Sequence, residues 1–319
     1  MIIRKATTED IPAIVQLLKA SLGDVSSEKS VAYWNWKHVT NPFGPSPVLV
    51  AEEEGQLIGV RALMRWDWQE GDRVYRALRA VDTATHPEHQ GKGIFKKLTL
   101  QLVEAATEEG YDFIFNSPNT QSTPGYLKMG WEVWGKMPLW LGLGSLSRKF
   151  QPHVYERYHQ QLLAADLAVV NCKVGKSVGL RTKISASFLQ WRYQQCPVKE
   201  YAFKTVERGD NRIWLFFSVK SRRFGMELRI CHFFFSREKD YRLLFTSAGD
   251  LAADLGCRVI TIAGLQQLPS TRLAGAGYFN IRRKSVQLTI RELANPTLYQ
   301  SLKANTLTWL PESGDIELF

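Results

Sequence analysis

The sequence predicts an α/β (α+β) protein built from two tandem copies of one fold, each a mixed, mostly antiparallel sheet flanked by helices. Three observations predict this fold class. A strand, a sharp turn and a helix follow one another within residues 80–98, and short strands joined by turns precede them. Segments of the first half recur in the second half in the same order. The length of 319 residues suits two domains of ordinary size.

The N-terminal part of the chain reads as a helix followed by an antiparallel hairpin. Ile2–Asp10 predicts a strand and the start of a helix, and Ile11–Ala20 carries its apolar residues on one helical face. After a proline-rich loop, the strands Val48–Glu52 and Leu57–Met64 are joined by a turn at Glu54-Gly55. These strands lead into the central strand–turn–helix unit.

The central unit has the features of a diphosphate-binding turn. Pro87 ends the strand, Gly91 and Gly93 follow, and from Ile94 the apolar residues have helical spacing. A glycine-rich loop at a helix start directs several backbone N–H groups to one point, where the helix dipole adds partial positive charge. Three lysines add full charges: Lys92, Lys96 and Lys97. The sequence therefore predicts that this turn binds a phosphate-bearing ligand.

The spacing of the turn decides among the known phosphate-binding patterns. The Walker pattern GxxxxGK[ST] is absent, and Lys96 occupies the third glycine position of GxGxxG. The segment Gln90-Gly91-Lys92-Gly93-Ile94-Phe95 instead resembles motif A of the GNAT acyltransferases, Q/R-x-x-G-x-G/A. It departs from that motif at Phe95, where Gly or Ala is usual.

A second motif follows in the order that this family has. Asn119 precedes Tyr126 by seven residues, and Tyr126 precedes Gly130-Trp131 by four, which is similar to motif B, N-x-x-x-x-x-x-Y-x-x-x-G-F, with Trp in place of Phe. In the family the Asn side chain binds the CoA arm and the Tyr lies beside the thioester sulfur. The resemblance covers about residues 1 to 140 and implies acetyl-CoA as the co-substrate. It assigns cofactor binding to Thr83, Ala84, Thr85, Gln90, Gly91, Lys92, Gly93, Ile94, Phe95, Lys96 and Asn119.

The resemblance also implies the chemistry, which is direct transfer of an acyl group from a thioester to an amine in a ternary complex. The amine must lose a proton, the developing oxyanion needs donors such as the strand N–H groups near Thr83–Thr85, and the leaving thiolate needs a proton. We assign Tyr126 as the general acid. We assign Asp82 as the base because it is the only acidic residue on the central strand, with Glu52 and Glu132 as rivals. For Tyr126 and Asp82 a purely structural role is the alternative.

Two alignments define the internal repeat. Tyr33–Pro42 matches Phe188–Pro197 with an offset of 155, the difference between Trp191 and Trp36. Gly130-Trp131 matches Gly277-Tyr278 with an offset of 147. Because order, spacing and residue type agree, we expect two copies of one fold.

The second copy lacks the residues that carry the chemistry. No Q/R-x-x-G-x-G/A pattern lies between Arg237 and Leu251, and Leu273 or a neighbour takes the place of Tyr126. We therefore expect this copy to form one wall of the acceptor cleft and not to bind CoA. The predicted division is a catalytic GNAT domain at 1–146, a helical connector at 147–175 and a degenerate GNAT-like domain at 176–319.

Composition narrows the function classes. The net charge of +10 suits anionic partners, among them CoA itself, but no nucleic-acid-binding motif accompanies it, so no nucleic-acid partner is expected. No apolar run approaches the roughly 20 residues of a membrane span, and no N-terminal signal is present, so we expect a cytoplasmic protein without a membrane span. The four cysteines and six histidines show no metal-ligand spacing, and no metal is expected.

The acceptor is left open by the sequence. We expect an amine on a small molecule or on a glycan, such as an amino sugar or a cell-surface glycan precursor, and the sequence leaves open N- against O-transfer and acetyl against longer acyl groups. Two W-x-W pairs, Trp34/Trp36 and Trp66/Trp68, suggest an aromatic wall for a sugar ring or ordinary packing. Two other functions compete: an aminoacyl-tRNA-dependent tandem transferase of the peptidoglycan type, and a non-catalytic acyl-CoA-binding regulatory protein. The oligomeric state is unknown.

Overall fold

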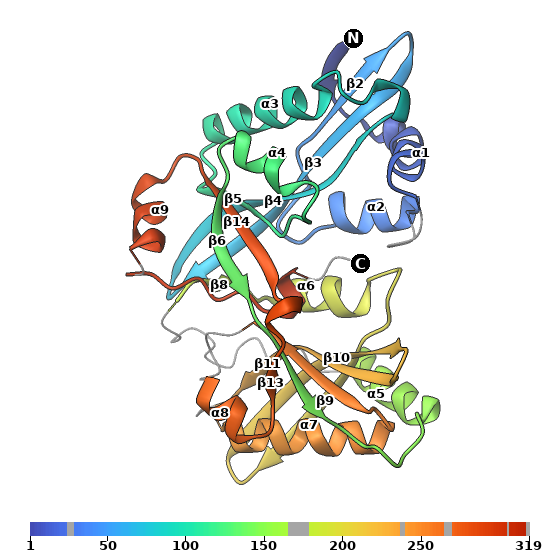
Figure 1. Ribbon diagram of the computed structural model, residues 1–319, viewed down its shortest axis with the longest axis vertical. Coiled ribbons are helices and arrows are strands. Elements are labelled where there is room, and N and C mark those ends of the chain that lie inside the picture. The colour runs from blue at the N-terminus through green and yellow to red at the C-terminus, as the bar shows by residue number, and fades with distance from the viewer. Residues whose placement is uncertain (24–28, 165–178, 237–239, 265–269, 305, 317–319) are drawn as a thin grey trace.

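The computed structural model describes residues 1–23, 29–164, 179–236, 240–264, 270–304 and 306–316 (Figure 1). Within them the chain forms two sheets, each flanked by helices, as expected. The first sheet contains, in spatial order, β1 (Ile2–Lys5), β2 (Val48–Glu53), β3 (Gln56–Glu70), β4 (Arg73–Thr85), β5 (Phe113–Asn116), β14 (Val286–Glu292) and β6 (Glu132–Met137), with the short β8 (Arg181–Thr182) paired to β3. The second contains β13 (Phe279–Asn280), β7 (Leu139–Leu143), β12 (Val259–Ala263), β11 (Gly225–Phe235), β10 (Asn211–Arg222) and β9 (Ala202–Arg208).

Both sheets are mixed and mostly antiparallel. The parallel pairs are β4 with β5 and β11 with β12, one in each sheet. The helices are α1 (Ile11–Leu22), α2 (Val31–His38), α3 (Ile94–Glu108), α4 (Thr123–Lys128), α5 (Pro152–Ala164), α6 (Ala186–Leu189), α7 (Tyr241–Leu255), α8 (Ser270–Gly275), α9 (Pro296–Lys303) and α10 (Ser313–Ile316). The predicted α/β class with two tandem sheets is confirmed.

The repeat extends to matching elements. The bounds of α3 and α7 differ by 147 residues at both ends, and those of α4 and α8 differ by the same number. With this offset Leu273, a buried residue of α8, is the counterpart of Tyr126 on α4. The two copies therefore share the order and the spacing of their elements from α3 onwards.

The two copies exchange their last strands. β7 belongs by sequence to the first copy, yet it pairs with β12 and β13 of the second sheet. β14, its counterpart in the second copy, lies between β5 and β6 of the first sheet. Only Pro138 separates β6 from β7, and Figure 1 shows this green segment passing from one sheet into the other.

The exchange bears on the predicted division of the chain. The boundaries at 146 and 176 stay a prediction about units of the sequence. In the structure each sheet contains a strand from the other predicted domain, β14 in the first sheet and β7 in the second. Within the predicted connector, α5 is helical from Pro152 to Ala164, and residues 165–178 lie outside the described part. No helix among the described residues is long and apolar enough to cross a membrane.

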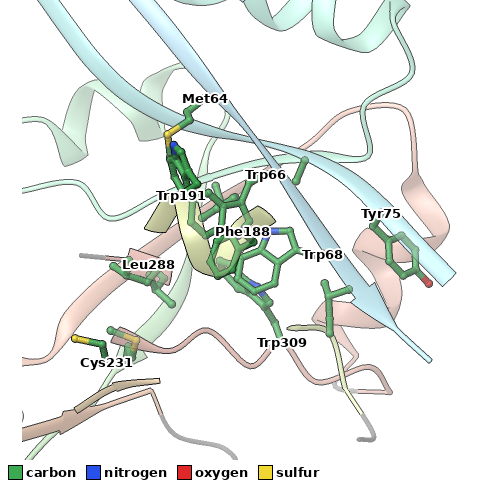
Figure 2. Packing of buried hydrophobic residues seen from close by; sticks show 14 of the residues in the cluster. Met64, Trp66, Trp68, Tyr75, Phe188, Trp191, Cys231, Leu288 and Trp309 are labelled. Carbon is green, nitrogen blue, oxygen red and sulfur yellow. The ribbon is translucent and has the colours of Figure 1, made fainter. Parts of the chain in front are cut away.

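An aromatic core joins the two copies. Trp66 and Trp68 on β3 pack with Phe188, Trp191 and Trp309 from the second half of the chain (Figure 2). Four of the tryptophans singled out from the sequence are at most 4% exposed: Trp34, Trp36, Trp66 and Trp68. Their alternative role as packing residues therefore holds, because none presents an open face to a sugar ring.

The two faces of the first sheet are covered differently. One face packs against α3 and α4 through an apolar cluster that includes Leu102 and Tyr126. The other face packs against α1 and α2, through residues such as Ile14 and Trp34. Side chains of β4 can therefore reach α4 on one side and α2 on the other.

Candidate active site

The turn before α3 is open and uncapped. Gly91 and Gly93 have φ of 78° and 75°, the left-handed region that favours glycine. A Cβ atom added at either position would meet no heavy atom within 4 Å. Gly93 is the N-cap residue of α3 and supplies no side chain to the first-turn N–H groups. These donors and the helix dipole are therefore available to an anion.

The second copy closes the equivalent position with its own carboxylate. Asp240 lies 147 residues after Gly93 and is the N-cap residue of α7, where its Oδ1 accepts a hydrogen bond of 2.9 Å from the Leu243 N–H. A side-chain carboxylate thus occupies the place that a phosphate would need. The contrast supports the expectation that only the first copy binds CoA.

The other residues predicted at the turn divide into exposed and packed groups. Gln90, Lys92 and Lys96 are exposed around the turn, whereas Ile94 is buried beneath it. The Phe95 ring packs edge-on against the Tyr126 ring, with 5.7 Å between centroids. Phe95, the departure from motif A, therefore connects α3 to α4 and leaves the glycines of the turn open.

β4 separates from β5 before it reaches the turn that precedes α3. The two strands are paired only where Ala77–Arg79 faces Phe113–Phe115, and β4 then continues to Thr85 paired with β3 alone. The edge of β4 from Ala80 onwards has no β5 partner. The predicted main-chain donors near Thr83–Thr85 lie in this part, and the Thr83 hydroxyl donates to the Val60 carbonyl oxygen across β3.

Tyr126 reaches this region from α4. It is 4% exposed, and its hydroxyl makes no hydrogen bond to another of the described residues. The Arg61 guanidinium lies 5.4 Å from the centroid of the Tyr126 ring and donates to the Val81 carbonyl oxygen on β4, at 3.2 Å. Arg61 therefore connects the ring of the predicted acid to the residue before the predicted base.

Asp82 lies at a bulge in β4. Arg61 pairs with Thr83 and Ala62 pairs with Val81, so Asp82 has no partner on β3. Its φ of 28° is positive, which is uncommon for a residue other than glycine. The bulge turns the Asp82 side chain towards α2, the opposite face from Tyr126.

Two cationic or polar groups of α2 hold the Asp82 carboxylate. Lys37 Nζ donates to Oδ2, and His38 Nε2 lies 2.7 Å from the same oxygen. Burial alone would raise the pKa of Asp82, but the Lys37 charge and the His38 hydrogen bond outweigh it and leave the pKa well below its usual range. Burial lowers the pKa of Lys37 and of His38. Asp82 is therefore ionised at neutral pH.

The remaining predicted residues have local partners. The Asn119 side-chain oxygen accepts from the Ser122 N–H at 2.8 Å, so that it closes the turn before α4. Glu52 pairs with Arg4, with 2.8 Å between the charged atoms. Glu132 pairs with Lys303 at 2.9 Å, beside α9. The two rival bases are thus engaged away from the bulge.

Sequence reasoning did not find Lys37, His38 or Arg61. Lys37 and His38 follow Trp36 at the end of a helix, and nothing in their spacing indicates a partner on β4. Arg61 lies inside an apolar strand, where a buried charge is rare. That unusual position was the one feature of the sequence that could have marked Arg61 as a functional candidate. Among the described residues no group of three or more His, Cys, Asp and Glu side chains is placed to hold a metal ion.

The chain matches known acetyltransferases in sequence. The family model described as "Acetyltransferase (GNAT) domain" matches residues 2–134. The L-amino acid N-acyltransferase MnaT of Escherichia coli K12 is 33% identical over 95 residues, which is 29% of this chain and 54% of that protein. The L-methionine sulfoximine/L-methionine sulfone acetyltransferase of Salmonella typhimurium LT2 is 31% identical over 117 residues, 34% of this chain and 67% of that protein. The match thus spans about half the length of the first relative and two thirds of the second.

The fold is similar over nearly the whole chain. A GCN5-related N-acetyltransferase from Anabaena variabilis aligns with a TM-score of 0.65 and 16% identity, covering 91% of this chain and 72% of that one. This likeness concerns the fold alone, and it includes the second copy. The resemblance to the GNAT acyltransferases, first based on the two motifs, is confirmed.

Proposed function

We propose that this chain, which belongs to the GNAT family of acetyltransferases, transfers an acetyl group from acetyl-CoA to the amine of a small molecule. The observation that carries the proposal is the uncapped start of α3 at Gly93. Its N–H groups and the surrounding lysines suit the diphosphate of CoA, and the unpaired edge of β4 suits the extended pantetheine arm.

Binding would place the thioester where β4 leaves β5. The predicted acid and base then approach it from opposite faces of the sheet, Tyr126 from α4 and Asp82 from the bulge. Main-chain N–H groups near Thr83–Thr85 stabilise the developing oxyanion, and Tyr126 protonates the leaving thiolate. Direct attack by the amine requires no nucleophilic side chain, and positioning alone lowers such barriers by roughly 7–11 kcal/mol.

For the acceptor we propose an amino-acid-like small molecule. Both relatives are named for the acylation of amino acids or their analogues, which favours this class over a glycan-linked amine. The anionic Asp82 suits a positively charged amine, and the buried tryptophans remove the main argument for a sugar.

Two measurements test the proposal against its alternatives. Calorimetric titration with CoA separates it from an aminoacyl-tRNA-dependent transferase, which needs no CoA site. Thioester turnover with a panel of amino acids and simple amines separates it from a non-catalytic CoA-binding protein. We expect CoA binding and amine-dependent release of the free thiol. Binding without turnover on any amine would reject the enzymatic role.

A further inference from the structure

Asp82 has one oxygen fixed by the protein and one free. Oδ2 receives the hydrogen bonds of Lys37 and His38. Oδ1 accepts no hydrogen bond from any other residue that the structure describes, and the side chain is 19% exposed. A free carboxylate oxygen beside a fixed one is suited to receive a donor from a ligand.

His38 is itself held in one orientation. Its side chain is 1% exposed, and its ring lies 4.1 Å from the Trp34 ring between centroids. Nδ1 lies 2.9 Å from the Ser46 Oγ, and the Ser46 N–H donates to the His38 carbonyl oxygen. Because Nε2 faces a carboxylate oxygen, we assign the ring hydrogen to Nε2, so that Nδ1 accepts from the Ser46 hydroxyl.

Lys37 completes the support from the other side of Oδ2. Its side chain is 6% exposed, and its ammonium lies 4.3 Å from the centroid of the Tyr33 ring. Among the described residues, Arg79 on β4 is a further charged group whose charge interacts with that of Asp82. The surroundings of Asp82 are thus net positive, and they keep the carboxylate ionised while leaving Oδ1 open.

We propose that Ser46, His38 and Lys37 are positioning residues that hold Asp82 so that its Oδ1 binds the protonated amine of the acceptor. The acceptor class is then a compound with a primary ammonium group. This inference rests on the proposed function and adds to it the group that captures the acceptor.

The proton balance follows from this arrangement. The ammonium bound at Oδ1 loses one proton to water, because a carboxylate whose pKa lies well below its usual range is too weak a base to keep that proton. The neutral nitrogen attacks the thioester carbon, so that a C–N bond forms and the C–S bond breaks. The thiolate takes the Tyr126 proton, and the second proton of the nitrogen restores Tyr126. The net products are an amide, a thiol and one proton.

The test compares three variants with wild type in acceptor kinetics and CoA titration. We expect Asp82→Asn to raise KM for the amine at least about tenfold, because the ammonium loses the charge of its hydrogen-bond acceptor, while CoA affinity stays unchanged. We expect His38→Leu also to raise KM for the amine without changing CoA affinity, since Asp82 loses a donor that orients its carboxylate. His38→Gln, which keeps a donor, should restore a KM near wild type.

Controls keep the outcomes separable. The exposed His153 on α5 provides a matched control, and His153→Gln should change none of these quantities. Nitrogen NMR of the His38 ring should give the Nε2–H tautomer without any turnover. If wild type turns over no amine, the proposed function is wrong. If wild type is active but Asp82→Asn leaves KM unchanged, or weakens CoA binding equally, this inference is wrong.

Discussion

Trp36 and Trp191 hydrogen-bond to each other in a symmetric way. The Trp36 indole N–H donates to the Trp191 carbonyl oxygen at 2.7 Å, and the Trp191 indole N–H donates to the Trp36 carbonyl oxygen at the same distance. Their rings stack at 4.5 Å with 11° between planes. The two residues are 155 positions apart, which is the offset of the repeat. The contact therefore joins equivalent positions of the two copies.

Trp36→Phe and Trp191→Phe should destabilise the protein to a similar extent. Each removes one buried hydrogen bond to a main-chain carbonyl oxygen, which costs about 0.5–1.5 kcal/mol of the free energy of unfolding. Urea unfolding measures both single variants and the double variant. The double variant should cost less than the sum of the single changes, because the rings share one stack. Additive or very unequal effects would contradict the symmetric contact.

The exchange of β7 and β14 predicts that neither half folds alone. A fragment of residues 1–164 lacks β14, so that β5 and β6 have no strand between them and β7 has no sheet. We expect fragments 1–164 and 179–319 to show no cooperative unfolding separately and to regain it when co-expressed. Circular dichroism and thermal melts measure this. A cooperative melt of the first fragment alone would show that β14 is dispensable.

Tyr126→Phe should lower turnover at least about tenfold, because the leaving thiolate loses its acid. CoA affinity should change little. Tyr111→Phe is the matched control, since Tyr111 belongs to the same apolar cluster and its buried hydroxyl has no hydrogen-bond partner among the described residues. Steady-state kinetics and CoA titration separate the two effects. Equal losses in turnover and in CoA affinity would remove the role of Tyr126 as acid.

His232 should make stability depend on pH. Burial acts to lower its pKa, but the Asp315 carboxylate, 3.1 Å from Nε2, outweighs burial and leaves the pKa raised above 6.5. A raised pKa stabilises the fold fully below pH 6.5, and this contribution is lost as pH rises through the folded value. The difference in unfolding free energy between wild type and His232→Gln should therefore shrink above pH 6.5. A difference that grows with pH would contradict the assignment.

The sequence was sufficient to predict features that depend only on the local conformation of the backbone. Gly91 and Gly93 have positive φ, and the need for glycine there could be read from the motif. Asp82 was found as the only acidic residue on the central strand, and Tyr126 through the resemblance to motif B, although their roles stay predictions. His38 could not be found, because its partner is created by a bulge whose position depends on the register of β3 and β4. The strand exchange was also missed, since alternation of apolar residues does not indicate which of two sheets a strand joins.

The most direct test of the account is calorimetric titration of CoA against Gly93→Asp. This change copies Asp240 of the second copy, whose carboxylate closes the start of α7. Gly71→Asp is the matched control, since Gly71 has a φ of 54°, an added Cβ there would meet no heavy atom within 4 Å, and it lies in the β3–β4 turn at the far end of β4 from Thr85. We predict that Gly93→Asp weakens CoA binding at least about tenfold, because its carboxylate competes with the diphosphate for the same donors, while Gly71→Asp binds as wild type does. Wild-type affinity in Gly93→Asp would contradict the claim that this turn holds the cofactor.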